Sequence, residues 1–488
     1  MNWNNTENRK MTSKRTFLKR GARVTTLAMA VVLGVTTAQG AADFRQETPA
    51  ERTQRMKWWT DARFGMFIHW GLYAMPARHE WVKSQEKMTD ERYARYFENF
   101  DPDRYNPRDW ARRAKAAGMK YMVLTTKHHD GFCLWDSAYT DYKATNTPAK
   151  RDLVREFVDA VRAEGLHVGF YYSLPDWHHP DAEISVSHPQ RPAYMASPFR
   201  VPADVPKEKV EADFKKLNEG RNHARYLQYV KDQLTELLTK YGQIDLLWFD
   251  GGLAPGSDKE SVLALVRKLQ PQILVNNRLG INERWGFDFG TPEQINLASG
   301  LRWKKTGELI PWEACHTFSG SWGYHRDEAT WADADQLIDQ LVQTVSVGGN
   351  LIMNVGPTAR GDIDARACAR LDDYAKWMEY HSKSIYGCTQ APEGFEAPRN
   401  TLLTYNPERN RIYMHVLRYP KGGVLEYDFD DKVRYAHFLH DNSEVKLVPY
   451  TDRGDGQIKP SLGRMPGYLR LPATRPDVIV PVIEMFLK

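Results

Sequence analysis

The sequence predicts an α/β fold: a (β/α)8-like (TIM) barrel, irregular in part, followed by a C-terminal antiparallel β-sandwich. From Met66 to about Pro357, short apolar runs alternate with amphipathic stretches, which is the pattern of a parallel sheet wrapped by helices. From about residue 390, apolar residues alternate with polar ones between turn residues, as in antiparallel strands. No glycine fingerprint of a dinucleotide or phosphate-binding loop follows any of the apolar runs.

Seven runs in the first region are rich in β-branched and aromatic residues and have the length of strands. Seven strands over about 300 residues favour a barrel with one irregular strand over an open doubly wound sheet. The predicted strands are Gly65–Trp70, Tyr121–Thr126, His167–Ser173, Ile244–Phe249, Ile273–Asn277, Trp312–Thr317 and Leu351–Val355.

The stretch His223–Tyr241 is the clearest predicted helix. Its apolar residues recur three or four positions apart, so one apolar stripe packs against a sheet. Similar stretches are Trp110–Ala117, Leu153–Ala163, Ser261–Leu269, Ala334–Val345 and Arg366–Tyr380. Beyond them, the predicted antiparallel strands are Leu402–Tyr405, Arg411–Leu417, Val424–Tyr427, Val433–Leu439 and Val478–Val482.

The beginning of the chain has the pattern of a signal peptide. A basic run between Arg9 and Arg23 precedes an apolar stretch that ends in small residues. The apolar stretch is short for a membrane span, so we expect export to a periplasm or to the medium. The predicted domains are residues 1–42 (signal peptide), 43–389 (catalytic barrel) and 390–488 (β-sandwich).

The charge of the remaining chain is close to neutral. The formal net charge is +5, but without residues 1–40 the chain has 60 basic and 61 acidic residues. This balance gives no electrostatic reason to expect nucleic-acid binding.

The four cysteines lack C-x-x-C spacing, so a zinc cluster is not expected. A Cys368–Cys388 disulfide is compatible with export, and the sequence alone does not decide it.

A Pro-rich and then charged insertion interrupts the barrel pattern between Asp181 and Gly220. It follows a predicted strand end, so we expect it to overhang the mouth of the barrel.

Polar and aromatic residues follow five of the predicted strands, and the C-terminal strand ends of a barrel build its active site. A sugar ring has apolar faces and hydroxyl edges, so aromatic planes beside hydrogen-bonding side chains suit it. The residues in question are His69, Glu80 and Trp81; His128 and His129; Tyr171; Trp248 and Asp250; and Arg278.

Three stretches resemble the retaining α-L-fucosidase family of glycoside hydrolases (glycoside hydrolase family 29). They are Ala62–Gly71, Lys127–Phe132 and Trp248–Gly251, and the likeness runs in motif order from about Trp58 to Gly356. The resemblance implies exo-acting removal of terminal α-L-fucose from a fucosylated oligosaccharide or glycoconjugate, without a cofactor or metal. It also implies that Asp250 is the nucleophile and that the fucose lies among His69, Glu80, Trp81, His128, His129, Tyr171, Trp248 and Arg278.

A retaining glycosidase needs two carboxyl groups about 5–5.5 Å apart. Asp250 suits one of them, because side chains two apart on a strand share a face and Asp250 therefore faces the same side as Trp248. The plain alternative is an Asp that caps the next helix.

The general acid/base is less clear from the sequence. We prefer Glu293, which lies 43 residues after Asp250 and resembles the spacing in several family members. Glu308 and Glu313 are competitors, although Glu313 stands inside a predicted strand, where it could be a buried, paired residue.

Adjacent histidines on a regular strand point to opposite faces, so His128 and His129 reach one sugar only if the chain bends after Lys127. Gly131 makes such a bend plausible. These histidines with Asp130 could instead be metal ligands.

Arg278 is expected to bind a hydroxyl or orient a carboxylate. Four tryptophans could stack on the sugar or belong to the core: Trp70, Trp135, Trp177 and Trp322.

Two further functions compete with fucoside hydrolysis. One is a catalytically silent fucose-binding protein on the same fold, and the presence of Asp250 with several candidate acids argues against it. The other is a metal-dependent hydrolase built on His128 and His129. Linkage preference and oligomeric state are left open by the sequence.

Overall fold

A computed structural model describes residues 47–281, 286–448 and 467–488. The predicted signal peptide lies outside these residues, and the predicted domain boundaries stay predictions. Within the described ranges, no helix is both long and apolar enough to cross a membrane.

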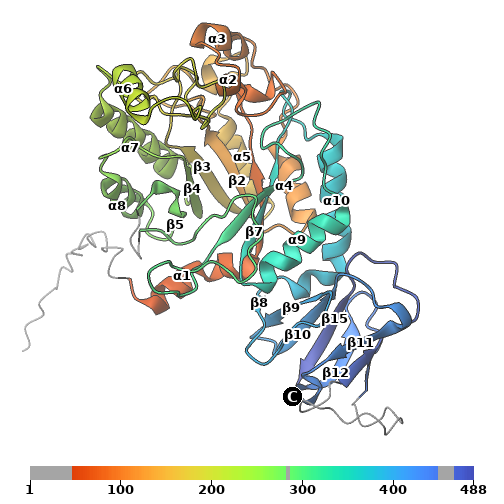
Figure 1. Ribbon diagram of the computed structural model, residues 1–488. Helices are drawn as coiled ribbons and strands as arrows, with labels where there is room; N and C mark the ends of the chain where they lie inside the picture. Colours follow the sequence, from red (N-terminus) through yellow and green to blue (C-terminus); the bar gives the residue numbers. More distant parts are fainter. Residues whose placement is uncertain (1–46, 282–285, 449–466) are drawn as a thin grey trace, which may run out of the picture. The chain divides into compact units, whose positions relative to one another are not determined.

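Seven parallel strands form a curled sheet with the order β5-β4-β3-β2-β1-β7-β6 (Figure 1). This arrangement confirms the predicted barrel class, and every predicted strand of this region is present within a few residues. The strands are β1 (Phe64–Ile68), β2 (Tyr121–Lys127), β3 (His167–Ser173), β4 (Leu246–Asp250), β5 (Leu274–Val275), β6 (Glu313–Thr317) and β7 (Asn350–Val355).

An irregular segment, residues 289–293, spans the gap between the two edge strands. Phe289 forms a parallel bridge with Asn276, just beyond β5, whereas Gly290 and Glu293 form parallel bridges with Trp312 and Cys315 beside and within β6. The segment therefore stands where an eighth strand would close the barrel, and it carries Glu293.

Helices surround the curled sheet (Figure 1). Helix α5 contacts β2 and β3, α9 contacts β7, and neighbouring helices pack on one another, as α4 does on α5 and α7 on α8. The helices are α1 (Pro49–Ala62), α2 (Val82–Gln85), α3 (Asp90–Glu98), α4 (Pro107–Ala116), α5 (Leu153–Ala163), α6 (Lys207–Leu217), α7 (His223–Lys240), α8 (Lys259–Leu269), α9 (Ala334–Ser346) and α10 (Ala365–His381).

Alternation along each strand divides the buried residues into two cores. Leu247 and Phe249 of β4 belong to the core between sheet and helices. Leu246 and Trp248 belong to a separate core inside the curl, together with Phe67 of β1 and Tyr171 of β3. Because the side-chain period of a strand is two, this register turns Asp250, the last residue of β4, toward the interior.

Two antiparallel sheets follow the barrel, one with the order β12-β15-β10-β9-β8 and one with the order β11-β14-β13. One predicted strand is misplaced: β15 begins at Val482, where the predicted Val478–Val482 ends. Pro481 has no N–H to donate to a ladder, so pairing starts after it. The strands are β8 (Thr389–Gln390), β9 (Thr401–Asn406), β10 (Arg411–Val416), β11 (Val424–Tyr427), β12 (Val433–Phe438), β13 (Lys446–Val448), β14 (Gly467–Arg470) and β15 (Val482–Leu487).

All four cysteines are free thiols in the structure, so the optional Cys368–Cys388 disulfide is not formed.

Candidate active site

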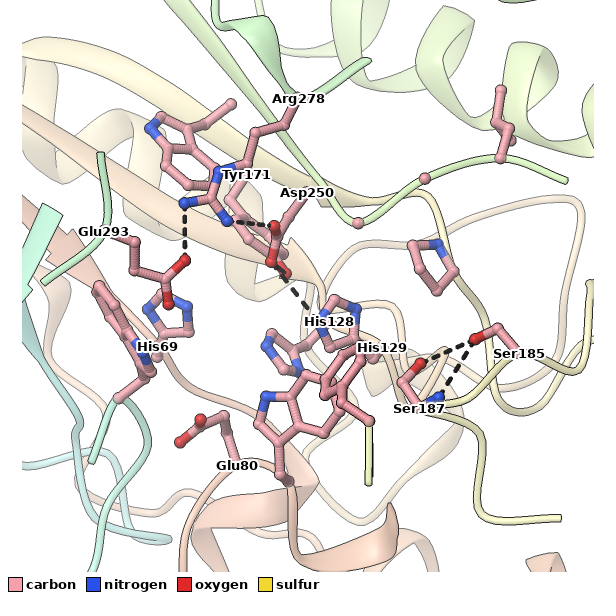
Figure 2. A pocket seen from close by; sticks show the side chains of 18 of the residues that line it. His69, Glu80, His128, His129, Tyr171, Ser185, Ser187, Asp250, Arg278 and Glu293 are labelled. Carbon is pink, nitrogen blue, oxygen red and sulfur yellow. Dashed lines mark hydrogen bonds and ion pairs between the residues drawn. The ribbon is translucent and has the colours of Figure 1, made fainter. Parts of the chain in front are cut away.

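A cavity of about 600 Å³ opens among the C-terminal ends of the strands. It brings together the nine residues expected around the fucose and the preferred acid/base residue, and Figure 2 shows most of these ten around one space. They are His69, Glu80, Trp81, His128, His129, Tyr171, Trp248, Asp250, Arg278 and Glu293. The insertion and nearby loops add residues that the sequence did not single out, among them Glu183, Ser185, Val186, Ser187, Phe199, Leu253 and Pro255.

Asp250 lies in the cavity wall as an accepting carboxylate. Its Oδ1 accepts from Arg278 Nη1 at 2.8 Å and its Oδ2 from the hydroxyl of Tyr171 at 2.9 Å. Burial by itself would raise the pKa of Asp250, but the Arg278 guanidinium and the hydrogen bond from Tyr171 help to bring that pKa below its ordinary value. An ionised carboxylate facing a cavity is the state that a nucleophile needs. The alternative role as a helix cap is wrong, because Asp258 caps α8.

Arg278 links the two carboxylates that the sequence paired. One guanidinium nitrogen binds Asp250, while Nη2 binds Glu293 Oε2 at 2.7 Å (Figure 2). Its Nε donates to Thr291 Oγ1 at 3.0 Å, and the guanidinium lies 4.5 Å from the ring centre of Trp248. The planar guanidinium, fixed from three sides, therefore holds Asp250 and Glu293 at neighbouring positions of the same cavity.

The hydrogen-bond network fixes the tautomer of His129. Ser173 Oγ donates to the carbonyl of Pro175 at 2.6 Å, so it must accept from His129 Nδ1, which lies 2.6 Å away. Burial lowers the pKa of His129, and in the neutral ring Nε2 then carries no proton. This bare nitrogen lies 3.6 Å from Asp250 Oδ2. This nitrogen can accept a hydrogen bond from a ligand hydroxyl.

His69 has the same tautomer as His129, because its Nδ1 also donates a hydrogen bond. Asn354 Nδ2 donates to the carbonyl of Trp322 at 2.6 Å, which leaves Asn354 Oδ1 to accept from His69 Nδ1 at 2.7 Å. Burial lowers the pKa of His69 to about 3, so the ring is neutral and its Nε2 is also an acceptor. Asn354 was missed in the sequence, although a polar residue near the end of β7 was a signal for it.

The bend that two adjacent histidines require is present. Strand β2 ends at Lys127, and Gly131 has a φ of 82°, in the left-handed region. A Cβ at Gly131 would lie 2.3 Å from Asp176 Oδ1, so glycine is needed there on both counts. Asp176 in turn forms a fully buried ion pair with Lys127 at 3.1 Å. This pair holds the turn that follows β2. As a result, both histidines line the cavity.

Glu80 has one oxygen without a hydrogen-bond donor. Its Oε2 accepts from the N–H of Gly323 at 2.8 Å, but Oε1 is buried without a hydrogen bond. His79 Nδ1 lies 3.2 Å from Oε1, yet that nitrogen accepts from the N–H of Trp81 and so carries no proton in the neutral ring. Burial raises the pKa of Glu80. The unmet Oε1 is therefore an attractive partner for a ligand hydroxyl.

The three candidate acids have very different surroundings. Glu293 lines the cavity with its side chain 43% exposed, against 19% for Asp250. Glu308 is exposed and lies outside the cavity lining. Glu313 is buried inside the barrel, where it accepts from Trp59, Tyr121 and Trp248. Only the position of Glu293 suits a proton donor that meets both substrate and water.

Of the four tryptophans that could contact the sugar or belong to the core, one lines the cavity and three are buried. Trp322 lines the cavity and packs against Phe67 and His69. Trp70 and Trp135 are core residues that hydrogen-bond to Thr358 and Glu236. Trp177 is buried behind the cavity, with its ring against Trp81 and His129.

A metal-dependent site finds no support in the described part of the chain, because no cluster of three or more His, Cys, Asp or Glu side chains there could hold a metal ion. The metal-free mechanism stays a prediction.

Comparison with known proteins agrees with this site. The family model for α-L-fucosidases matches residues 32–383, which is most of the chain. The chain belongs to the α-L-fucosidase family. The plasma α-L-fucosidase of Rattus norvegicus is 32% identical over 395 residues, covering 75% of this chain and 78% of the relative. The α-L-fucosidase of Branchiostoma floridae is 30% identical, with coverage of 75% and 80%.

Solved structures of α-L-fucosidases have the same fold. Isoenzyme 1 from Paenibacillus thiaminolyticus is 41% identical, with a TM-score of 0.78 over 90% of this chain and 99% of that one. A family 29 enzyme from Bacteroides thetaiotaomicron, 29% identical, has a TM-score of 0.71 over 91% and 96%. The chain is thus a glycoside hydrolase, and its enzyme class is α-L-fucosidase.

Replacement of Arg278 by Gln should move the acidic limb of the pH–rate profile to higher pH. We expect Asp250 to react as an anion, and without the guanidinium the effect of burial, which raises its pKa, is less strongly opposed. The active form then appears only at higher pH. The check is kcat/KM for an activated aryl fucoside between pH 3 and pH 9, and an unmoved acidic limb would show that Arg278 does not set the charge of Asp250.

Proposed function

We propose that this enzyme removes terminal α-L-fucose from glycans by a retaining double displacement, with Asp250 as nucleophile and Glu293 as general acid/base. One observation carries the proposal: an ionised, cavity-facing Asp250 and a half-exposed Glu293 are bound to the two ends of the Arg278 guanidinium. This chemistry requires two carboxyl groups on one cavity, one ionised for attack and one that can carry a proton.

In the first step, a carboxylate oxygen of Asp250 attacks the anomeric carbon of fucose and the glycosidic C–O bond breaks. Glu293 gives its proton to the departing oxygen, so the leaving group departs as an alcohol. In the second step, Glu293 accepts a proton from water while that water's oxygen attacks the same carbon and releases Asp250. Two inversions at one carbon restore its original configuration.

The binding of the fucose follows from the unmet acceptors in the wall. The free Nε2 of His69, the free Nε2 of His129 and Oε1 of Glu80 each need a donor, and sugar hydroxyls are donors. His129 Nε2 next to Asp250 suits a hydroxyl beside the anomeric carbon. The rings of Phe67, Trp248 and Trp322 give the apolar part of the sugar a surface to contact.

A solved neighbour supports the covalent route. The structure of a family 29 fucosidase from Bacteroides thetaiotaomicron, 29% identical and with a TM-score of 0.70, is described as a trapped covalent intermediate with 2-fluoro-fucosyl fluoride. That is the kind of intermediate which attack by Asp250 would form here.

The test is the configuration of the first product. Proton NMR during hydrolysis of a nitrophenyl α-L-fucoside should show α-L-fucose before any β-L-fucose from mutarotation. A fucosylated oligosaccharide serves as a second substrate, because an enzyme restricted to branched linkages can fail on the aryl fucoside. The β anomer appearing first would refute retention, and binding without turnover of either substrate would favour the silent sugar-binding protein.

We also propose that the enzyme is exported after removal of residues 1–42. The support is the basic run and apolar stretch of the sequence. Mass spectrometry of the protein from the periplasm or medium would identify the mature N-terminus.

A further inference from the structure

The insertion between β3 and α7 forms part of the cavity wall. Five of its residues line the same cavity as Asp250 and Glu293: Glu183, Ser185, Val186, Ser187 and Phe199. Figure 2 shows Ser185 and Ser187 on the side of the cavity away from Glu293, with Asp250 and His129 between. We name these five residues the insertion wall. A cavity of about 600 Å³ is within the range of roughly 300–1,000 Å³ that accepts ligands of several rings.

A buried arginine holds the insertion wall in place. Arg191, only 3% exposed, donates from Nη1 to the carbonyl of Ser84 at 2.9 Å and from Nε to that of Met195 at 3.0 Å. It also binds the carbonyls of His188 and Ala196. The hydroxyl of Ser84 donates to the carbonyl of Ser187. The wall is thus tied to α2, which directly follows Trp81.

Phe199 is the unusual member of the wall. The residue is 67% exposed although it is large and apolar, and its φ of 59° is in the left-handed region that favours glycine. Its ring centre lies 5.4 Å from that of Trp81, with the planes tilted by 51°. An exposed aromatic ring held in a strained conformation at a cavity rim is suited to contact a ligand.

Polar groups of the wall complete the chemistry of a sugar site. Ser185 and Ser187 place their hydroxyl oxygens 3.0 Å apart toward the cavity, and Glu183 adds a half-buried carboxyl group. Burial raises the pKa of Glu183. An aromatic face beside hydroxyl and carboxyl groups matches a sugar ring, which has apolar faces and hydroxyl edges.

We propose that the insertion wall is the subsite for the sugar residue to which the fucose is attached, with Phe199 as the platform for that ring. The inference rests on the proposed function, because it concerns the leaving group of that reaction. It makes the enzyme select fucosides by the sugar that departs, and it gives residues 181–220 a role in specificity.

The test compares two substrates that differ only beyond the fucose. One is a disaccharide in which α-L-fucose is attached to N-acetylglucosamine. The other is α-L-fucosyl fluoride, whose leaving group is a single atom and cannot reach the wall. Phe199→Ala should lower the ratio of kcat/KM for the disaccharide to kcat/KM for the fluoride about tenfold, since a ring contact is lost. Phe199→Tyr keeps the platform and should keep the ratio within about twofold.

Two controls separate the platform from the stability of the loop. Val201→Ala changes an exposed apolar residue of the same insertion that does not line the cavity, and the ratio should not change. Phe199→Gly relaxes the left-handed backbone, so the ratio should fall while the Tm is kept or raised. An unchanged ratio in Phe199→Ala, or an equal fall in Val201→Ala, would overturn the proposal.

Failure of the proposed function has a different signature: either the β anomer appears first, which leaves the comparison of the two substrates valid, or the wild type hydrolyses neither substrate. Calorimetry decides the subsite in the second case. Phe199→Ala should bind the disaccharide about tenfold more weakly than wild type and bind free fucose equally well. Equal binding of the disaccharide by both proteins would refute the subsite.

Discussion

Replacement of Asp250 by Ala is expected to lower kcat about 10³-fold or more, because the covalent route disappears with the attacking carboxylate. Asp250→Asn should lose as much, since the amide has nearly the same shape but no charge. The measurement is steady-state turnover of a nitrophenyl α-L-fucoside or a fucosylated oligosaccharide. Added azide or formate is expected to restore part of the turnover of Asp250→Ala, because a small anion fits the vacated space.

A matched control is available on the same loop. Asp258→Ala removes the exposed cap of α8, whose side chain accepts from the N–H of Ser261. Loss of such a cap costs about 1 kcal/mol of stability and should leave kcat unchanged. Wild-type turnover by a well-folded Asp250→Ala protein would refute the nucleophile assignment, as would an equal loss in Asp258→Ala.

Replacement of Glu293 by Ala is expected to have an effect that depends on the leaving group. A general acid matters most when the departing oxygen is strongly basic, as in a sugar, and least for an activated phenol. Glu293→Ala should therefore hydrolyse a fucosylated oligosaccharide about 10²-fold or more slowly than wild type. With dinitrophenyl α-L-fucoside it should keep much of its glycosylation rate, which a burst measurement reports.

The two competing glutamates serve as comparisons. Glu308→Ala removes an exposed side chain outside the cavity and should act like wild type on both substrates. Glu313→Gln is preferable to Ala inside the barrel, since truncation would leave the donors of Trp59, Tyr121 and Trp248 unpaired. If either variant showed the leaving-group dependence and Glu293→Ala did not, the acid/base role would pass to that glutamate. The role of Asp250 would be unaffected.

The position of Asp250 could be predicted because it depends on local periodicity. A run such as Leu246–Asp250 has a side-chain period of two, and a barrel has one inner face, so the face of Trp248 also fixes that of Asp250. The same local reasoning placed seven strands and the bend at Gly131. It failed at β15, where the missing N–H of Pro481 delays pairing.

The surroundings of Asp250 and of the candidate glutamates could not be read from local patterns. Glu293 stands in an irregular segment whose place is fixed by bridges to Asn276 on one side and to β6 on the other. Glu313 is equally acidic in sequence, and only the packing of Trp59 and Tyr121 around it removes it from the cavity.

The sequence by itself determined the barrel, the family and the place of Asp250 at an inward-facing strand end, because strand alternation and short motifs are encoded within a few neighbouring residues. The tertiary structure decided which glutamate joins Asp250, which nitrogens of His69 and His129 are free, and how the insertion wall meets Trp81. Each of these depends on contacts between segments far apart in the chain, as when Asn354 orients His69 or Arg191 binds the carbonyl of Ser84. Such contacts form only when the strands take their final order, and no local pattern specifies them.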